Sequence, residues 1–438
     1  MAKSYRPYLP DQDFLLPPRL REWLPENHLV YFASDVIDKL DLAAMDAVYG
    51  DEQRGQPPYD PRMLTKVLVY GYCVGVYSSR RLERRLAEDV AFRELAAGNA
   101  PNFRTISDFR KLHLATLAGL FEAVLKIALE AGALKLGRVA LDGTKVKANA
   151  SKHKAMSYGR MQDKERQLRA EVRRLLAEAE AADAKEDAQY GADQRGDELP
   201  AELQRRETRL KKIREARRAL EERARQQAEQ DGKPAAEAKP ADKDQYSFTD
   251  PESRLMKGSD GWLQGYNAQA AVESTLQLIV GQSVTQAGND KEQIAPMVEV
   301  IERQSGQRPA AILADNGYCS ERNLAYLETA VQSGPPIAAY IATGKVKHDE
   351  YRRPCPRGAL PENATRVERM QRKLQTKAGR AVYAARKTMV EPVFGQIKEA
   401  RGFRHFLLRG LTKVRGEWAL VCLTHNILKL HRLCYQQK

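Results

Sequence analysis

The sequence of 438 residues predicts an α/β domain with a mixed sheet, which is interrupted once by a helical hairpin and preceded by an all-α region. Three observations predict this. Residues 1–130 carry apolar side chains at helical spacing, and residues 160–229 are highly charged, with 18 basic and 17 acidic side chains. From residue 246 onward, short β-rich runs alternate with amphipathic helical segments. The length allows two or three domains.

The N-terminal region, 1–130, is expected to be helical. Pro61 marks one helix start, Ser79 is a candidate N-cap for the next helix, and Thr105 or Ser107 is a candidate cap for a third. The second helix carries a basic cluster of Arg80, Arg81, Arg84 and Arg85. Such a bundle either contains a helix-turn-helix whose arginines contact DNA, or is purely structural with a solvated Arg-rich face.

Residues 160–245 are expected to form an antiparallel helical hairpin followed by a flexible linker. Apolar side chains recur at heptad-like intervals in two stripes: Leu168, Val172, Leu175 and Leu176, then Leu203, Leu210, Ile213 and Leu220. The hairpin should therefore bury its seam against itself. The Pro-, Ala- and Lys-rich stretch that follows has the composition of a linker.

The sheet domain is expected to comprise 131–159 and 246–438. Two β-rich runs at 266–273 and 276–286 precede an amphipathic helix that should begin at Asn289 or Asp290. A strand, a helix, another strand and a basic helix then follow in order. With the apolar run Val139 to Leu141 as the first strand, this order predicts a mixed sheet with one long insertion.

Two of these apolar runs end in an acid that is followed closely by glycine. Val139 to Leu141 leads into Asp142-Gly143, and Ala311 to Ala314 leads into Asp315-Asn316-Gly317. Both patterns are also typical of hairpin turns. The alternative is that the sheet fixes two carboxylates as ligands for a hard cation.

The charge of the chain points to a polyanionic partner. There are 72 Lys and Arg against 58 Asp and Glu, a formal charge of +14, and residues 371–415 hold twelve Lys and Arg against only Glu391 and Glu399. A solvated basic surface is the simpler alternative. The five cysteines form no CxxC motif, and no apolar run approaches the roughly 18 residues of a membrane span. We therefore expect no membrane partner and a cytoplasmic location.

Several blocks in order resemble the DDE transposases of bacterial insertion sequences. LDGTKVKANAS, LMKGSDGWLQGYNAQAAVE, ADNGY and VEPVFGQIKEARGFR are similar to catalytic blocks of that family, and YDPRMLTKVLVYGY, VYSSRRLERRL and TISDFR to its N-terminal domain. The resemblance implies a ribonuclease-H-like catalytic domain behind a helical DNA-binding domain at 1–130.

Carried over residue by residue, the resemblance assigns catalysis and the binding of two Mg²⁺ (or Mn²⁺) ions to Asp142, Asp315 and Glu391. Many relatives have a Tyr, Arg, Glu and Lys signature around the glutamate. Here Lys398 keeps its spacing from Glu391, but the spacing before the glutamate differs, so the arginine role falls to Arg386 or Lys387, with Tyr383 upstream. The implied phosphate contacts are Lys398, Arg401 and Arg404, with Lys145, Lys147 and Asn149 as weaker candidates.

The implied function is that of a nucleoid-associated transposase. It would bind the terminal inverted repeats of its element and catalyse metal-dependent DNA cleavage and strand transfer, with a homodimer holding the element ends and the target duplex. The alternatives are a ribonuclease-H-like nuclease without strand transfer and a catalytically silent DNA-binding regulator descended from a transposase.

Overall fold

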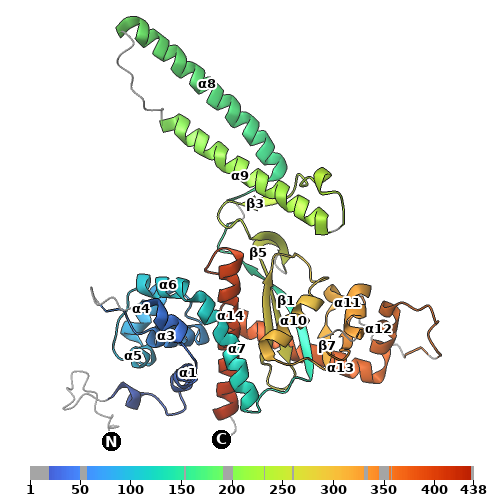
Figure 1. Cartoon of the computed structure of the whole chain (residues 1–438). Coiled ribbons are helices and arrows are strands. Elements are labelled where there is room, and N and C mark those ends of the chain that lie inside the picture. Colours follow the sequence, from blue (N-terminus) through green and yellow to red (C-terminus); the bar gives the residue numbers. More distant parts are fainter. Residues whose placement is uncertain are drawn as a thin grey trace, which may run out of the picture.

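The computed structural model describes residues 19–49, 57–151, 154–190, 201–230, 232–258, 261–329, 334–344, 355–356 and 358–435. Its helical N-terminal part lies beside the sheet, the C-terminal helix lies between them, and a long helical hairpin projects away from both (Figure 1).

Within the described parts of 1–130, all regular structure is helical. The elements are η1 (Leu20–Trp23), α1 (Leu29–Asp38), α2 (Ala43–Asp46), η2 (Ala47–Tyr49), α3 (Pro61–Cys73), α4 (Ser79–Glu88), α5 (Val90–Leu95), α6 (Phe103–Leu112) and α7 (Leu114–Glu130).

The start of α3 at Pro61 is confirmed, but the caps expected for α4 and α6 are wrong. Ser79 is the first residue of α4 rather than its N-cap. Asn102 caps α6 by accepting a hydrogen bond from the backbone N–H of Thr105 at 2.9 Å. The helix therefore begins before Thr105, and the amide of Thr105 is the donor that the cap satisfies.

Six strands form one mixed sheet: β1 (Arg138–Lys147), β4 (Arg254–Gly258), β5 (Gly261–Glu273), β6 (Ile279–Thr285), β7 (Ala311–Ala314) and β8 (Ala338–Ile341). β5 pairs antiparallel with β1, β4 and β6, whereas β1, β7 and β8 are parallel neighbours. The predicted strand order is present, with β4 as an unforeseen addition. The arrangement is compatible with a ribonuclease-H-like domain.

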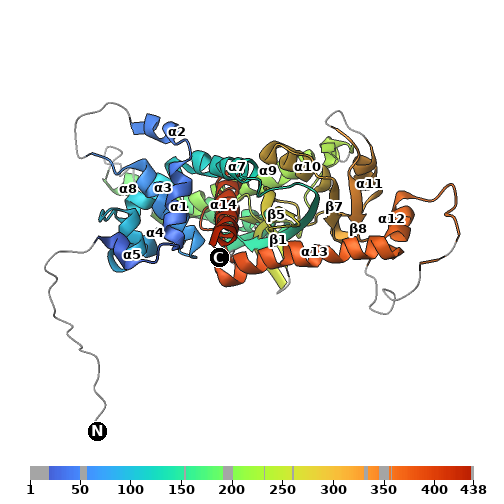
Figure 2. The same ribbon diagram turned by 90° about the horizontal axis from the view of Figure 1, so that it is seen from below.

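Helices cover the sheet and extend from its last strand. They are α10 (Ile294–Ser305), α11 (Glu321–Glu328), α12 (Arg366–Gln375), α13 (Lys377–Gly395) and α14 (Leu411–Tyr435), with a π-helical turn, η7 (Gln396–Ala400), directly after α13. Figure 2 shows α13 running along one side of the sheet, with α10 on the other. α13 contacts β1, β5, β7 and β8.

The helical N-terminal part and the sheet share one hydrophobic core. α14 packs against α3 and α7 on one side and against β6 on the other, and Trp418, Val421 and Leu423 are fully buried. The buried residues of all these elements form one continuous cluster. Residues 19–130 therefore depend on the C-terminal helix for part of their core.

The insertion contains β2 (Ala155–Ser157), α8 (Tyr158–Tyr190), α9 (Ala201–Gln230), η4 (Ala235–Glu237) and β3 (Gln245–Ser247). The two helices pack antiparallel around a small core of their own. Leu168, Leu210, Ile213 and Leu220 are buried there, but Leu176 is exposed. The side chain of Leu203 lies outside the described residues. The seam is thus sealed near the base of the hairpin.

Residues 232–244 of the predicted flexible linker contain the 3₁₀ turn η4 and make backbone contacts with the start of α8. Asp242 and Asp244 accept backbone hydrogen bonds from Gly159 and Tyr158 at 3.2 and 2.9 Å. β3 then pairs with β2. The Pro-, Ala- and Lys-rich composition predicts no regular structure. The segment is nevertheless attached to the start of α8 by these backbone hydrogen bonds.

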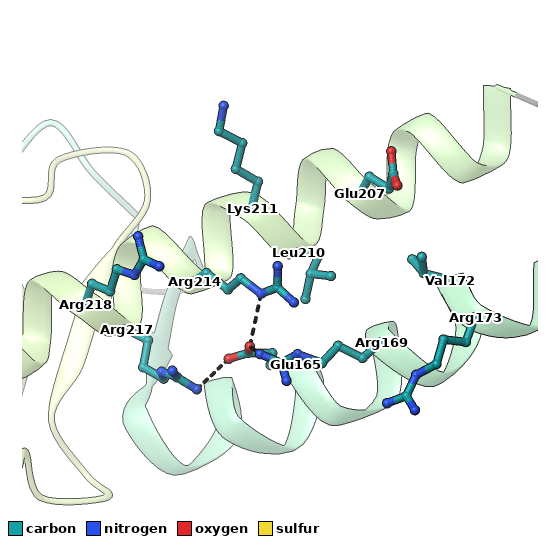
Figure 3. Close-up of a pocket in the computed structure, with 10 residues that line it drawn as sticks. All are labelled: Glu165, Arg169, Val172, Arg173, Glu207, Leu210, Lys211, Arg214, Arg217 and Arg218. Carbon is teal, nitrogen blue, oxygen red and sulfur yellow. Dashed lines mark hydrogen bonds and ion pairs between the residues drawn. The ribbon is translucent and has the colours of Figure 1, made fainter. Parts of the chain in front are cut away.

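A buried carboxylate pins the two helices of the hairpin together. Glu165 on α8 accepts hydrogen bonds from Arg169 at 2.5 Å, and from Arg214 and Arg217 of α9 at 3.1 and 2.7 Å. Figure 3 shows these arginines around it in a pocket of about 630 Å³. Burial opposes ionisation of Glu165, but the arginines outweigh it and lower its pKa.

Glu165→Ala should loosen the hairpin without unfolding the sheet, because the hairpin has a separate core and two arginines of α9 lose the carboxylate that links them to α8. Limited trypsin digestion should cut 160–230 several times faster than in the wild type. Glu178→Ala, which removes an exposed partner of Arg174 on the same helix, is the matched control and should change little. Equal digestion of both variants would contradict a pinning role for Glu165.

Candidate active site

Asp142 lies in the middle of β1 and not at a turn. The strand continues to Lys147, and Asp142 faces Ala270 of β5 in the antiparallel ladder. Its Oδ1 accepts a hydrogen bond from the backbone N–H of Gly143 at 2.9 Å. The hairpin alternative for this acid is therefore wrong, because β5 pairs with β1 on both sides of it.

Asp315 directly follows β7 and caps the 3₁₀ turn η5 (Asn316–Tyr318), where it accepts a hydrogen bond from Gly317 N–H at 2.8 Å. This sequence is also no hairpin. β7 is parallel to β1, with Leu313 opposite Ala140. Continuing that register by two residues brings Asp315 beside Asp142, so neighbouring strands present both carboxylates.

Arg386 joins the third predicted acid to the first. Its guanidinium donates to Asp142 Oδ2 and to Glu391 Oε1, both at 3.3 Å. The arginine side chain is 11 % exposed, whereas Glu391 is 50 % exposed. Lys387 is exposed, so Arg386 is the residue of this pair that reaches the acids. The two terminal nitrogens of the Arg386 guanidinium thus bind Asp142 and Glu391, one each.

Pro392 lies inside α13, next to Glu391. Proline cannot donate a backbone hydrogen bond to the carbonyl four residues earlier, which is that of Thr388. This carbonyl instead accepts from the side chain of Gln277 at 2.7 Å. Gln277 has a positive φ of 61° in the turn between β5 and β6. The turn between β5 and β6 therefore supplies the hydrogen bond that Pro392 cannot give to α13, one residue after Glu391.

Asp290 is a fourth acid at the site, and its sequence context had predicted a helix start at this residue or at Asn289. α10 instead begins at Ile294. Asp290 Oδ1 accepts hydrogen bonds from Asn267 at 2.7 Å and Gln269 at 2.6 Å, and its Oδ2 lies 3.8 Å from Lys145 Nζ. The sequence did contain a signal for this acid: Asn267 and Gln269 lie on a buried strand, and buried amide side chains need a polar partner.

Burial and the neighbouring charges shift the pKa values of Asp142 and Lys145. Burial raises the pKa of Asp142 to about 6, against the opposing charge of Arg386, and the charges of Asp315 and Asp290 raise it further. Burial lowers the pKa of Lys145, although all three aspartates act in the opposite direction. Arg386 and Lys145 are two cations beside the four carboxylates of Asp142, Asp290, Asp315 and Glu391, and this excess of negative charge favours an additional cation.

The donors present at the site fit magnesium. Among the described residues, no three His, Cys, Asp or Glu side chains are arranged to hold a metal ion. Carboxylate oxygens are the ligands that Mg²⁺ prefers, and Asp142, Asp315 and Glu391 supply only oxygens. In this structure Arg386 contacts the oxygens of two of them, so it would have to give way to a metal ion at that position.

The remaining predicted residues are placed very differently. Lys398 in η7 donates to the backbone carbonyl of Lys145 at 3.3 Å. Arg401 is buried and donates to Thr424 Oγ1 at 2.7 Å and the carbonyl of Val421 at 3.1 Å. The prediction that it holds a phosphate does not fit this position, because its guanidinium already binds inside the core. Arg404 is exposed and pairs with Glu399.

Of the weaker candidates, Lys147 is exposed and Asn149 bonds to the carbonyl of Leu407 at 2.7 Å. Lys145 belongs with the acids, as described above. Tyr383 is half-buried on α13.

The arginine cluster on α4 faces outward. Leu82 and Leu86 of the same helix are buried, so Arg80, Arg81, Arg84 and Arg85 share its exposed side. Arg80 lies over the ring of Phe103, 5.0 Å from its centre, and Arg85 pairs with Asp89 at 3.3 Å. In the part of the chain that the structure describes, Arg81 and Arg84 have no ion-pair partner.

Gly143 leaves room for the amide and carboxylate groups at Asp290. A Cβ added to Gly143 would lie 2.3 Å from Gln269 Nε2 and 2.7 Å from Asp290 Oδ1. These two atoms are hydrogen-bonded to each other at 2.6 Å, and displacing either one alone breaks that bond. Gly143→Ala should therefore displace Asp290 and lower thermal stability by several degrees, measured by calorimetry. Gly137→Ala, which meets no atom within 4 Å, is the control; equal melting temperatures for the two variants would refute the crowding.

No single described helix is long and apolar enough to cross a membrane. α6 and α7 reach that length and composition only as a pair, and they are bent by 69° at their junction.

Two family models match the chain. Residues 18–112 match the family described as Transposase domain (DUF772), and residues 358–431 match the family described as Transposase DDE domain. The second match includes Arg386, Glu391 and Lys398. No curated protein and no solved structure matches the chain.

Proposed function

Because the chain belongs to the DDE transposases of insertion elements, we propose that it binds the terminal inverted repeats of its element and cleaves DNA there. The freed 3′ hydroxyl would then attack the target duplex. The observation that carries the proposal is the convergence of Asp142 and Glu391 on Arg386, beside Asp315 on the neighbouring strand.

Asp142, Asp315 and Glu391 would hold the divalent ions, Mg²⁺ or Mn²⁺. Bound there, two such ions would supply activation of the attacking hydroxyl and stabilisation of the leaving oxygen of a phosphodiester. The rigid parts of this arrangement are the two aspartates, since each is fixed by a sheet strand and by a backbone N–H bond. Glu391 is the adjustable part, because it is half exposed on a helix.

The chain's own cations have separate tasks. Arg386 holds Glu391 near Asp142 and offsets their repulsion, a role that a bound divalent ion would take over. Lys145 and the two amides on β5 fix Asp290, whose charge adds to the attraction for cations. Lys398, on the π-helical turn, is anchored at the carbonyl of Lys145 on β1 and would contact the DNA phosphates next to the site.

Further DNA contacts would come from Arg404, Lys147 and the exposed arginines of α4. Arg401 is left out because it is buried. Since an element has two ends, we propose a homodimer in the DNA complex and a location on the nucleoid.

A strand-transfer assay tests the proposal and separates it from its rivals. The full chain is incubated with labelled duplex carrying the element end, with supercoiled plasmid and with Mg²⁺. A transposase should place label on the plasmid. Cutting of the duplex without labelled plasmid would indicate a nuclease alone, and binding without cutting would indicate a silent regulator. Cutting that persists in excess chelator would contradict the metal dependence.

The α4 arginines should supply affinity for the element end. In the full chain, Arg81→Gln together with Arg84→Gln should weaken binding and flatten its dependence on salt by about one to two units of slope. Gel shifts with end and random duplexes measure this. The full chain is needed because residues 19–130 share their core with α14. If the double variant and wild type bind the end equally at every salt concentration, α4 is no DNA contact.

A further inference from the structure

We propose that a basic cavity at the far end of β1 binds an unpaired stretch of DNA strand, with one base stacked on Trp262. The inference rests on the DNA-cutting function proposed above and extends it to a second contact outside the active site. The cavity measures about 750 Å³. It is lined by the end of β1 and the segment that follows it, by the start of β5, and by the segment after η7.

The charge of the cavity suits a nucleic-acid backbone. Its walls carry Lys147, Lys154, Arg404 and Arg409, together with His405, and no carboxylate is among the described residues that line it. Arg409 is held in place by a bond to the carbonyl of Asn149 at 2.9 Å. Arg404 also pairs with Glu399, which does not line the cavity and would be displaced by a phosphate. Phosphates attract such a group of cations wherever the DNA path passes it.

Trp262 decides what kind of DNA fits. Its side chain is 61 % exposed, at the start of β5, whereas Trp418 is completely buried in the core. An indole ring beside several cations is a platform for a base, because bases stack on aromatic rings with little regard to sequence. Inside a duplex both faces of a base are already covered by its neighbours. The exposed ring therefore favours an unpaired nucleotide over a paired one.

The distance from the acids follows from the strand itself. Lys147 is five residues beyond Asp142 on β1, which corresponds to about 17 Å at roughly 3.3 Å per residue. One DNA strand advances about 3.4 Å per nucleotide in a duplex. A strand that leaves the active site along β1 would reach the cavity after about five nucleotides. The cavity thus suits DNA that is opened a few nucleotides from the cut.

The test uses the full chain in the presence of a chelator, so that binding is measured without cutting. The probes are a fluorescent 20-nucleotide oligothymidine and a 20-base-pair duplex of mixed sequence, followed by anisotropy. Trp262→Ala should weaken oligothymidine binding about tenfold and change duplex binding by less than about twofold. Trp262→Phe, which keeps a ring, should recover most of the loss. Trp23→Ala removes another exposed tryptophan and should leave both affinities unchanged.

A second pair of variants tests the charge. Lys154→Gln should reduce the salt dependence of oligothymidine binding by about 0.7 of a unit of slope, and Lys126→Gln, on the exposed side of α7, should not. Equal oligothymidine binding by Trp262→Ala and wild type overturns the proposal, and so does an equal loss with both probes, which would make the cavity a duplex contact. Neither result bears on metal-dependent cleavage, which the strand-transfer assay judges separately.

Discussion

Asp142→Asn, Asp315→Asn and Glu391→Gln should each abolish cleavage of an element-end duplex in Mg²⁺, by about a thousandfold or more, while DNA binding persists. Each change keeps the size and polarity of the side chain but removes the charge that a hard cation needs. The losses should not add in a double variant, because the three residues serve one metal centre.

Stability distinguishes this result from simple unfolding. Glu391 is half exposed, so losing its contact with Arg386 should cost only about 0–1 kcal/mol. The raised pKa of Asp142 means that its charge is partly unfavourable in the folded protein, so Asp142→Asn should unfold no more easily than wild type at neutral pH. Urea titrations beside the cleavage assay check this. Near wild-type cutting by any of the three variants would remove that residue from the site.

The second large effect concerns Arg401. Arg401→Leu should lower the free energy of unfolding by about 3 kcal/mol, because it strips the buried Thr424 hydroxyl and the Val421 carbonyl of a donor. The same arginine also bonds to the carbonyl of Tyr72 at 3.5 Å. Its loss should therefore be felt in α3, α14 and the π-helical turn together. Urea unfolding, followed by circular dichroism, measures the change.

Arg404→Leu is the matched control, three residues away in the same basic stretch. Arg404 is exposed, so its replacement should leave stability within about 0.5 kcal/mol of wild type and weaken DNA binding instead. The two variants thus distinguish a structural role for Arg401 from a DNA-binding role for Arg404, two arginines that look alike in the sequence. A stable Arg401→Leu protein with weakened DNA binding would reverse the assignment.

The sequence predicted the parts of the fold that local patterns encode. The apolar runs before Asp142 and Asp315 are buried strands, since a sheet covered by helices needs continuous apolar segments. Glu391 came from the resemblance alone. Local patterns misplaced the starts of α6, which Asn102 caps, and of α10, which begins at Ile294, because several capping residues stood close together in each segment.

Other features depend on contacts between distant residues, which no local pattern contains. Arg401 looked like a surface cation, yet it directly follows the π-helical turn and binds Thr424 and the Val421 carbonyl of α14 inside the core. Asp290 resembled a helix cap because its partners, Asn267 and Gln269, are more than twenty residues away. The core that α14 shares with α3, α7 and β6 could not be predicted either, since the apolar side chains of a helix do not show which elements it packs against.

The position of α14 has a consequence for biosynthesis. α7 ends at Glu130 and α14 begins at Leu411, so a ribosome adding about 5–20 residues per second makes the second roughly 15–55 s after the first. During that interval, the apolar surfaces of α3 and α7 that α14 covers remain open to solvent or to chaperones. The N-terminal helices would therefore reach their final packing late in translation. A nascent chain would bind DNA weakly until α14 has packed against them.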